Sequence, residues 1–170
     1  MFLWIVRPAR WVTQIISGAD SPRQIGSGFA LGMLIGLVPK DNLCAAVLLV
    51  LLLGTRSNRA AGLLAALLFS WIGLLLDPLT HRIGYELLAY EPFRPYLGRL
   101  YALPLAPWTA LHNTVVLGSL ALGLVLAWPV YVLASDAAAW LKPRFLEWAR
   151  RRRLMRNITG APAAPGWRGE

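Results

Sequence analysis

Hydrophobic and polar residues separate into blocks along this chain. Apolar blocks occupy approximately residues 25–38, 43–54, 60–76 and 114–134, whereas polar residues collect at the two ends and in three short breaks. Continuous apolar runs of this length are typical of helices buried in protein or in lipid. Only the last block has the roughly 20 residues that cross about 30 Å of hydrocarbon unaided. The pattern therefore predicts an all-α chain whose helices are mostly short.

The start of the first of these helices carries a complete capping signal. Ser21 can cap the helix, Pro22 suits its first position, and Gln24 can close a capping box with Ser21. Pro39 ends the apolar run, so we expect a helix over 22–38. At 1.5 Å per residue this helix is about 25 Å long, which is marginal for a crossing.

A polar turn joins this helix to the next apolar block. Asp41 or Asn42 can cap a helix over 43–54, which Arg56 and Arg59 follow. Either both helices cross a thinned bilayer, or they form a re-entrant hairpin that returns to the side it left. Both arrangements keep the flanking arginines in the cytoplasm, but two crossings require a span of only about 12 residues. We therefore favour the hairpin.

Small residues recur at helical spacing in each long block. They form one stripe per helix, and such stripes let helix backbones approach closely in lipid. Two of the stripes lead to an ionisable residue, Asp77 in one case and His112 in the other. We expect the helices to pack through Gly28, Gly32 and Gly36, through Gly62, Ser70 and Gly73, and through Ser119 and Gly123.

The remaining segments complete a topology with both termini in the cytoplasm. Residues 77–113 are expected to lie largely outside the membrane, and the prolines of 91–108 predict a non-helical loop there. Trp128 and Pro129 should kink or end the last helix. The chain then divides into an interfacial amphipathic helix over 1–20, a membrane domain over 21–135, a basic cytoplasmic helix over 136–156 and a disordered tail over 157–170.

Composition supports the membrane interpretation. Hydrophobic residues make up 57% of the 170 residues and charged residues 15%, with a mean hydropathy of +0.54. Soluble domains have about 45–50% apolar and about 25% charged residues. A soluble helical protein would also need amphipathic helices to cover its apolar ones, and this chain has too few. The single Cys44 lies in an apolar block and is expected to pack as a small hydrophobe.

The net charge of +9 comes largely from basic residues that flank the apolar blocks. Arg7, Arg10 and Arg23 flank the first block, and a cluster that includes Arg150–Arg153 follows the last one. Basic clusters beside membrane segments mark the cytoplasmic side and attract anionic headgroups. RNA binding by Arg150–Arg153 is the alternative, but topology explains the cluster better. We therefore expect membrane lipids as partners and no nucleic acid.

Three polar spots interrupt the apolar sequence and are the candidate functional residues. Ionisable groups within a membrane are costly and usually functional, so these spots could line a polar cavity. Helix capping is the alternative, because Asp77 precedes Pro78 and Asn113 precedes the last helix. Both interpretations stay open. The spots are Lys40, Asp41 and Asn42, then Asp77, His81 and Arg82, then His112 and Asn113.

Signals for catalysis are weak. The two histidines are about 30 residues apart, and no carboxylate lies at metal-ligand spacing from them. Asp77 and His81, four residues apart, could together act as a general base in a membrane hydrolase. However, no recognisable turn marks a Ser or Cys nucleophile. The glycines at every fourth position follow a packing spacing and not that of a phosphate-binding loop. We expect a non-enzymatic protein without a metal or cofactor.

Several of these stretches together resemble a known family. They are Arg23–Pro39, which contains Gly28-Phe29-Ala30-Leu31-Gly32 and Ile35-Gly36, then Phe69–Gly73, then Asp77–Arg82. The resemblance, over roughly 21–135, is to an uncharacterised family of small bacterial inner-membrane proteins with a G-F-A-L-G-x-x-I-G-x-x-P first helix and a later Asp-Pro or Asn-Pro element. It implies an inner-membrane location without implying a reaction. It also implies a gene beside that of a larger envelope protein.

Two functions follow as expectations. The first is a non-enzymatic inner-membrane component that acts with a larger envelope protein, or by self-association, in lipid handling or envelope assembly. The alternative is a small oligomeric transporter or channel that uses the re-entrant hairpin and Asp77 as a polar pathway.

Overall fold

The computed structural model describes residues 20–158, with side chains described up to residue 147. The expected interfacial helix and almost all of the expected disordered tail lie outside these residues. The described chain is all-α, as predicted. Its five α-helices are α2 (Pro22–Leu37), α3 (Leu43–Gly54), α4 (Arg59–Ala89), α5 (Arg94–Tyr101) and α6 (Thr114–Ile158), with short 3₁₀ helices η1 (Glu91–Phe93) and η2 (Ala106–Thr109).

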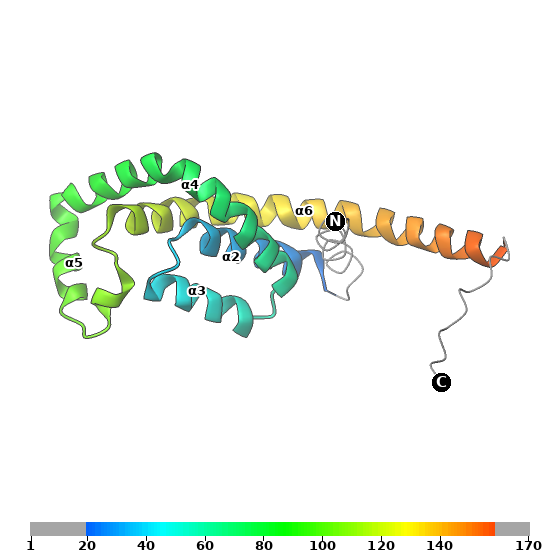
Figure 1. Cartoon of the computed structure of the whole chain (residues 1–170), viewed down its shortest axis with the longest axis horizontal. Helices are drawn as coiled ribbons and strands as arrows, with labels where there is room; N and C mark the ends of the chain where they lie inside the picture. Colours follow the sequence, from blue (N-terminus) through cyan, green and yellow to red (C-terminus); the bar gives the residue numbers. More distant parts are fainter. Residues whose placement is uncertain (1–19, 159–170) are drawn as a thin grey trace, which may run out of the picture.

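Helix α2 is the centre of the bundle and packs against both α4 and α6 (Figure 1). Its start has the predicted capping box, in which the Gln24 N–H donates to Ser21 Oγ at 3.3 Å and the Ser21 N–H donates to Gln24 Oε1 at 2.7 Å. Most of its residues are buried, including the large side chain of Met33. An apolar helix surrounded in this way needs no polar face.

The long helices run between two ends of the bundle, α2 and α4 in one direction and α6 in the other. Helices α2 and α4 start together, since the Asn58 N–H donates to the Gln24 carbonyl at 2.8 Å. Helix α6 runs the opposite way and reaches the same end near Ala138, which packs against Ile25 and Ala61. We call this the basic end, because Arg23, Arg56, Arg59 and Lys142 lie there. The opposite end, with the turn between α2 and α3, is called the far end.

Glycines allow α2 and α4 to touch through their backbones. A Cβ atom built on Gly28 would overlap the Asn58 carbonyl group, and one on Gly32 would overlap that of Gly62. A Cβ on Gly36 would lie 2.6 Å from the Cβ of Phe69. Only glycine permits so close an approach, and the many backbone contacts it allows hold helices together in a lipid environment.

A second tight crossing joins α4 to the start of α6. A Cβ on Gly84 would overlap the Thr114 carbonyl group, and one on Gly118 would overlap the Thr80 carbonyl group. Neither glycine belongs to the stripes singled out in the sequence. Further along α6, Ser119 is buried, and a Cβ on Gly123 would lie 2.6 Å from the side chain of Leu34.

Helix α4 is longer than predicted. The sequence indicated an end near residue 76 with Asp77 as the cap of a new helix, but α4 continues through Pro78 to Ala89. Pro78 has no N–H to donate to the Leu74 carbonyl, and α4 follows a curved path (Figure 1). The crossing at Gly84 keeps the part of α4 that follows Pro78 packed on α6. Asp77 therefore caps no helix, which excludes the capping interpretation left open for it.

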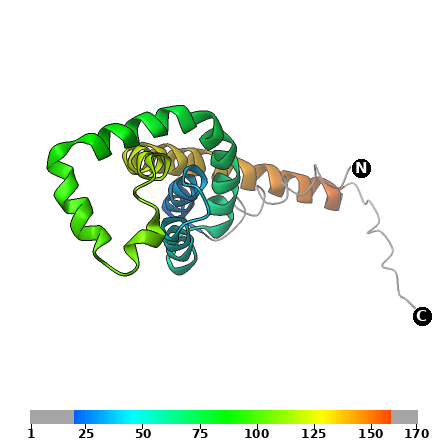
Figure 2. The same ribbon diagram turned by 60° about the vertical axis from the view of Figure 1, so that its left-hand side comes forward.

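The segment predicted as a non-helical loop over 91–108 is instead partly helical. It contains η1, α5 and η2, and each of them has a proline in its first two positions. Proline is tolerated there because the first N–H groups of a helix have no partner within the helix. With the last turns of α4, this segment forms an arch beside the bundle (Figure 2).

Helix α6 also continues past the expected break. It passes through Pro129 and Pro143 and ends at Ile158. Of the two outcomes predicted at residues 128–129, a kink or an end, the end is therefore wrong. The predicted basic helix over 136–156 is the later part of this same helix. With 45 residues, α6 is about 67 Å long, and its last turns project beyond the other helices (Figure 1).

Candidate functional site

The first polar spot forms the turn at the far end between α2 and α3. Asn42 is buried and caps α3, with its Oδ1 accepting from the Ala45 N–H at 3.0 Å and its Nδ2 donating to the Pro39 carbonyl at 2.6 Å. Lys40 Nζ donates to the Gly36 carbonyl at 3.0 Å and so caps the end of α2. Asp41 is exposed. These contacts give side-chain partners to two backbone carbonyls and one backbone N–H at the turn.

The second and third polar spots meet at one surface contact, between His81 and the Thr114 that follows Asn113, whereas His112 pairs separately with Tyr101. His81 Nδ1 is 2.6 Å from Thr114 Oγ1, which links α4 to α6. His112 Nδ1 is 3.4 Å from the Tyr101 hydroxyl, and the two rings stack edge to face with centroids 5.8 Å apart. Asn113 accepts from the Val115 N–H at 2.8 Å and caps the start of α6.

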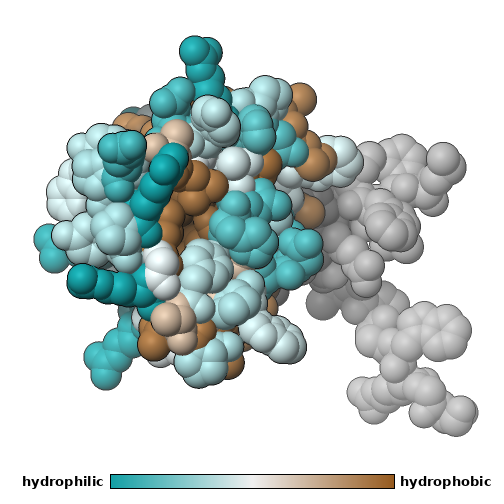
Figure 3. Space-filling model, turned by 90° about the vertical axis from the view of Figure 1, so that its left-hand side faces the viewer, coloured by the Kyte–Doolittle hydropathy of each residue, from teal (hydrophilic) through white to brown (hydrophobic). Residues whose placement is uncertain are grey.

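Most of the predicted polar residues lie on the surface of the far end. Asp77, His81, Arg82, His112 and Asn113 are all exposed. Figure 3, which views this end, shows hydrophilic side chains arranged around a patch of hydrophobic ones. Within the described chain no group of three His, Cys, Asp or Glu residues could hold a metal ion. These residues therefore form no common buried cavity.

The basic end also has a hydrogen-bonded cluster that the sequence pattern does not predict. Asn58 is buried and caps α4, with its Oδ1 accepting from the Ala61 N–H at 2.7 Å. Its Nδ2 donates to Asp20 Oδ2 at 2.7 Å, and Lys142 Nζ donates to the Asp20 carbonyl. The cluster joins the starts of α2 and α4 to α6. The only sequence signal for it was Asn58 itself, a good capping residue before an apolar block.

Beside this cluster lies a polar pocket of about 590 Å³. Two cationic side chains line it, from the loop between α3 and α4 and from the first residue of α4. The pocket is lined by Asp20, Gln24, Gly54, Thr55, Arg56, Ser57, Asn58, Arg59 and Ala60. It is suited to a small anionic group that stays in contact with water.

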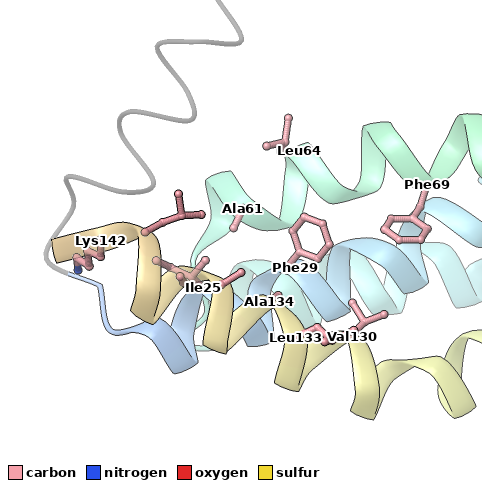
Figure 4. Close-up of a pocket in the computed structure, with 12 residues that line it drawn as sticks. Ile25, Phe29, Ala61, Leu64, Phe69, Val130, Leu133, Ala134 and Lys142 are labelled. Atoms are coloured by element: carbon pink, nitrogen blue, oxygen red, sulfur yellow. The ribbon is translucent and has the colours of Figure 1, made fainter. Parts of the chain in front are cut away.

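On the other side of the cluster, an apolar groove runs between α2, α4 and α6. It encloses about 400 Å³, and its lining is apolar except for Lys142. Figure 4 shows Lys142 at one end of the groove and Phe69 towards the other. The groove is lined by Ile25, Phe29, Ala61, Leu64, Phe69, Val130, Leu133, Ala134, Ala137, Ala138, Leu141 and Lys142. Nothing in the sequence pattern had marked it, because its walls come from three separate helices.

The outer surfaces of α3, α4 and α6 expose large apolar side chains. Val50, Leu75 and Val125 are among the most exposed. Within the described residues, α4 and the part of α6 over Thr114–Glu147 are long and apolar enough to cross a membrane. Only 22% and 28% of their most apolar windows are buried, whereas the core helix of a soluble protein is mostly buried. These two helices are therefore candidate membrane spans.

Comparison with known proteins places the chain in a family. Residues 7–147 match the family described as "Uncharacterized protein conserved in bacteria (DUF2062)". The chain belongs to this family. An uncharacterized protein of Treponema pallidum (strain Nichols) is 27% identical over 116 residues, which are 68% of this chain and 72% of that protein. No solved structure matches the chain.

The part matched by the DUF2062 family contains the whole helical bundle except the last turns of α6. The match ends at residue 147, so it includes the apolar groove, the polar pocket and both candidate spans, and it stops before Arg150–Arg153. The bundle is thus the family's domain, and the last turns of α6 extend beyond it.

Proposed function

We propose that this protein is a multi-pass protein of the bacterial inner membrane that acts, without catalysing a reaction, with an envelope partner in lipid handling. The observation that carries this proposal is the exposure of its two long apolar helices. Most of the apolar window of each lies on the surface of the bundle. In water this surface would cause aggregation, whereas hydrocarbon solvates it.

The charges along α4 and α6 support a position in the bilayer. No Asp, Glu, His, Lys or Arg occurs in 60–76 of α4 or in 115–135 of α6. These stretches are about 26 and 32 Å long, close to the thickness of about 30 Å of a hydrocarbon core. Arg23, Arg56 and Arg59 lie at the basic end, so the positive-inside rule puts that end in the cytoplasm. Both termini of the described chain would then face the cytoplasm.

Helices α2 and α3 have the geometry that a re-entrant hairpin requires. They start and end at the basic end, and α3 is only about 18 Å long. Only Ala45 and Leu52 of α3 are buried, so its apolar surface faces outwards on most sides. The turn at its tip is stabilised by Asn42 and Lys40, which satisfy backbone carbonyls that lipid could not.

The alternative of a transporter that uses Asp77 gains no support from this geometry. Asp77 is exposed on α4, and His81 pairs with Thr114 at the surface of the same end. A polar pathway through Asp77 would need further copies of the chain. The better-formed site is instead the groove beside Lys142. Its lining is otherwise apolar, which suits a lipid and does not suit the passage of an ion.

Single-cysteine labelling in intact cells tests the proposed topology. In a Cys44→Ala background, we expect a membrane-impermeant thiol reagent to label position 90 from the periplasm and position 57 only after the cytoplasm is opened. Position 41, at the tip of the hairpin, should react with the periplasmic reagent much more slowly than position 90. Labelling at 57 from the periplasm would contradict the orientation, and equal rates at 41 and 90 would contradict the hairpin.

A deletion strain tests the proposed role. We expect its envelope barrier or its phospholipid composition to change, and we expect the tagged protein to co-purify with a larger envelope protein. An unchanged lipid profile, an intact barrier and no stable partner would together contradict the role while leaving the topology standing.

A further inference from the structure

We infer that the apolar groove binds one acyl chain of an anionic phospholipid, with the phosphate of that lipid beside Lys142. This inference rests on the proposed function, because it requires the basic end of the bundle to lie at the cytoplasmic surface of the bilayer. It names the lipid class and the position that lipid handling by this protein would use.

The shape of the groove suits a hydrocarbon chain. From Val130 to Lys142 the groove follows 12 residues of α6, which is about 18 Å. One leaflet accounts for about half of the roughly 30 Å hydrocarbon core, so a chain of one leaflet can lie along the groove. Phe29 and Phe69 contact each other edge to face, with ring centroids 6.1 Å apart, and both line the groove. Walls of this kind favour hydrocarbon over any polar ligand.

The charge at the mouth of the groove suits a phosphate. Lys142 is partly buried and donates to the backbone carbonyl of Asp20, while the carboxylate of Asp20 accepts from Asn58. Within the described part of the chain, no carboxylate forms an ion pair with Lys142. Its remaining N–H groups can therefore donate to a phosphate oxygen, and a charge-assisted hydrogen bond of this kind is a strong one.

Further cations lie near this position. Arg56 and Arg59 line the polar pocket on the other side of Asp20 and Asn58. The acidic groups at this level are Asp20 and the exposed Asp136, so positive charge prevails. Each basic residue that lies beside a bound headgroup favours anionic lipid by about fivefold, and the effect falls off with distance from the headgroup. The site therefore prefers an anionic headgroup over a zwitterionic one.

Charge also favours an anionic lipid over the chain's own first residues as the occupant of the groove. Residues 1–19 contain Arg7 and Arg10 and no Asp or Glu, so they would bring positive charge towards Lys142. The groove is open at its side, where Leu133 and Ala137 are exposed. A lipid can enter from the surrounding leaflet through this opening, and an anionic headgroup matches the charge that it meets.

The inference is tested by native mass spectrometry of the full chain. The protein is reconstituted in vesicles that contain phosphatidylcholine and a minor fraction of phosphatidylglycerol, and is then released in mild detergent. We expect one retained phosphatidylglycerol per chain. Ala137→Trp fills the groove and should remove this lipid, whereas Ala139→Trp, at an exposed position outside the groove, should not.

Two further variants test the headgroup. Lys142→Gln should lower the preference for phosphatidylglycerol over phosphatidylcholine by about fivefold. Arg144→Gln is the matched control, because the Arg144 guanidinium lies over the Trp140 ring at 3.6 Å and does not line the groove. Equal retention by Ala137→Trp and Ala139→Trp, or equal preferences in the Lys142 and Arg144 variants, would overturn the inference.

A diazirine amino acid at position 137 identifies the occupant directly. A phosphatidylglycerol adduct, enriched over the composition of the vesicle, is expected, with no such enrichment from position 139. An adduct to residues 1–19 of the same chain or to a second copy would overturn the inference in favour of that occupant. Resistance of each variant to alkaline extraction from membranes is measured in parallel. An inserted wild-type protein that retains no phosphatidylglycerol contradicts only the groove as a lipid site, whereas failure of the wild type to insert contradicts the proposed function.

Discussion

Gly32 of α2 and Gly62 of α4 meet with no space for a side chain between them, because a Cβ on Gly32 would overlap the Gly62 carbonyl group. This contact lies in the middle of the α2–α4 crossing, between those of Gly28 and Gly36. It brings the buried helix α2 against α4, and the apolar groove lies beside it. The position of the groove walls therefore depends on this crossing.

Replacing Gly32 should destabilise the bundle. Gly32→Ala forces α2 and α4 apart, and overpacking of this kind costs about 1–3 kcal/mol. Gly98→Ala is the matched control, since a Cβ at Gly98 meets nothing within 4 Å and alanine favours a helix. Thermal unfolding in detergent should show a lower midpoint for Gly32→Ala and an unchanged or higher one for Gly98→Ala. Equal midpoints would show that the α2–α4 crossing accommodates the added methyl group without loss of stability.

Gly118 should be as sensitive as Gly32 at the other crossing. A Cβ on Gly118 would overlap the Thr80 carbonyl group, so Gly118→Ala should separate α4 from α6 at the far end. The hydrogen bond between His81 and Thr114 joins the same helices on an exposed surface, and Thr114→Val should cost only about 1 kcal/mol. Unfolding midpoints in the same detergent check this order. A larger loss for Thr114→Val would mean that the polar contact, and not backbone packing, holds this end.

Asn58 should be the most sensitive polar residue at the basic end. It caps α4 from a buried position and also binds Asp20, so Asn58→Ala should cost about 2 kcal/mol, the upper part of the range for a lost cap. Asn113→Ala removes an exposed cap and should cost less. The comparison uses denaturant titration in micelles. A cost for Asn113→Ala that equals or exceeds that for Asn58→Ala would contradict the cluster's role.

Asp77 should be dispensable for both stability and lipid binding. It is exposed and its predicted capping role is absent, so Asp77→Asn should change stability by no more than about 0.5 kcal/mol. Retention of phosphatidylglycerol should stay at the wild-type level. If this substitution abolished a flux of solute across reconstituted vesicles, the transporter alternative would replace the present account.

Local signals in the sequence predicted the local structure well. The capping box at Ser21 and the cap at Asn42 depend on residues three positions apart, and both are present. The glycine spacing of α2 and α4 depends only on helix periodicity. Each of these features depends on residues within one or two turns of helix, so the sequence pattern is enough to predict it.

The features that were missed depend on contacts between distant residues. Lys142 and Asp20 are separated by 122 positions, so no local pattern could pair them. The continuation of α4 past Pro78 depends on Gly84 packing against Thr114 of α6, which offsets the local tendency of proline to end a helix. The groove is formed by three helices and has no sequence motif of its own.

The proposed function requires the exposed apolar surface of the bundle to face lipid. Spin labels at Leu67, Leu74, Tyr90 and Tyr96 test it, because these side chains are similarly exposed on the protein, at 58%, 67%, 62% and 66%. In reconstituted vesicles, labels at 67 and 74 should be relaxed mainly by oxygen, which concentrates in hydrocarbon. Labels at 90 and 96 should be relaxed mainly by a water-soluble nickel complex. Dominant relaxation by the nickel complex at 67 and 74 would contradict the account.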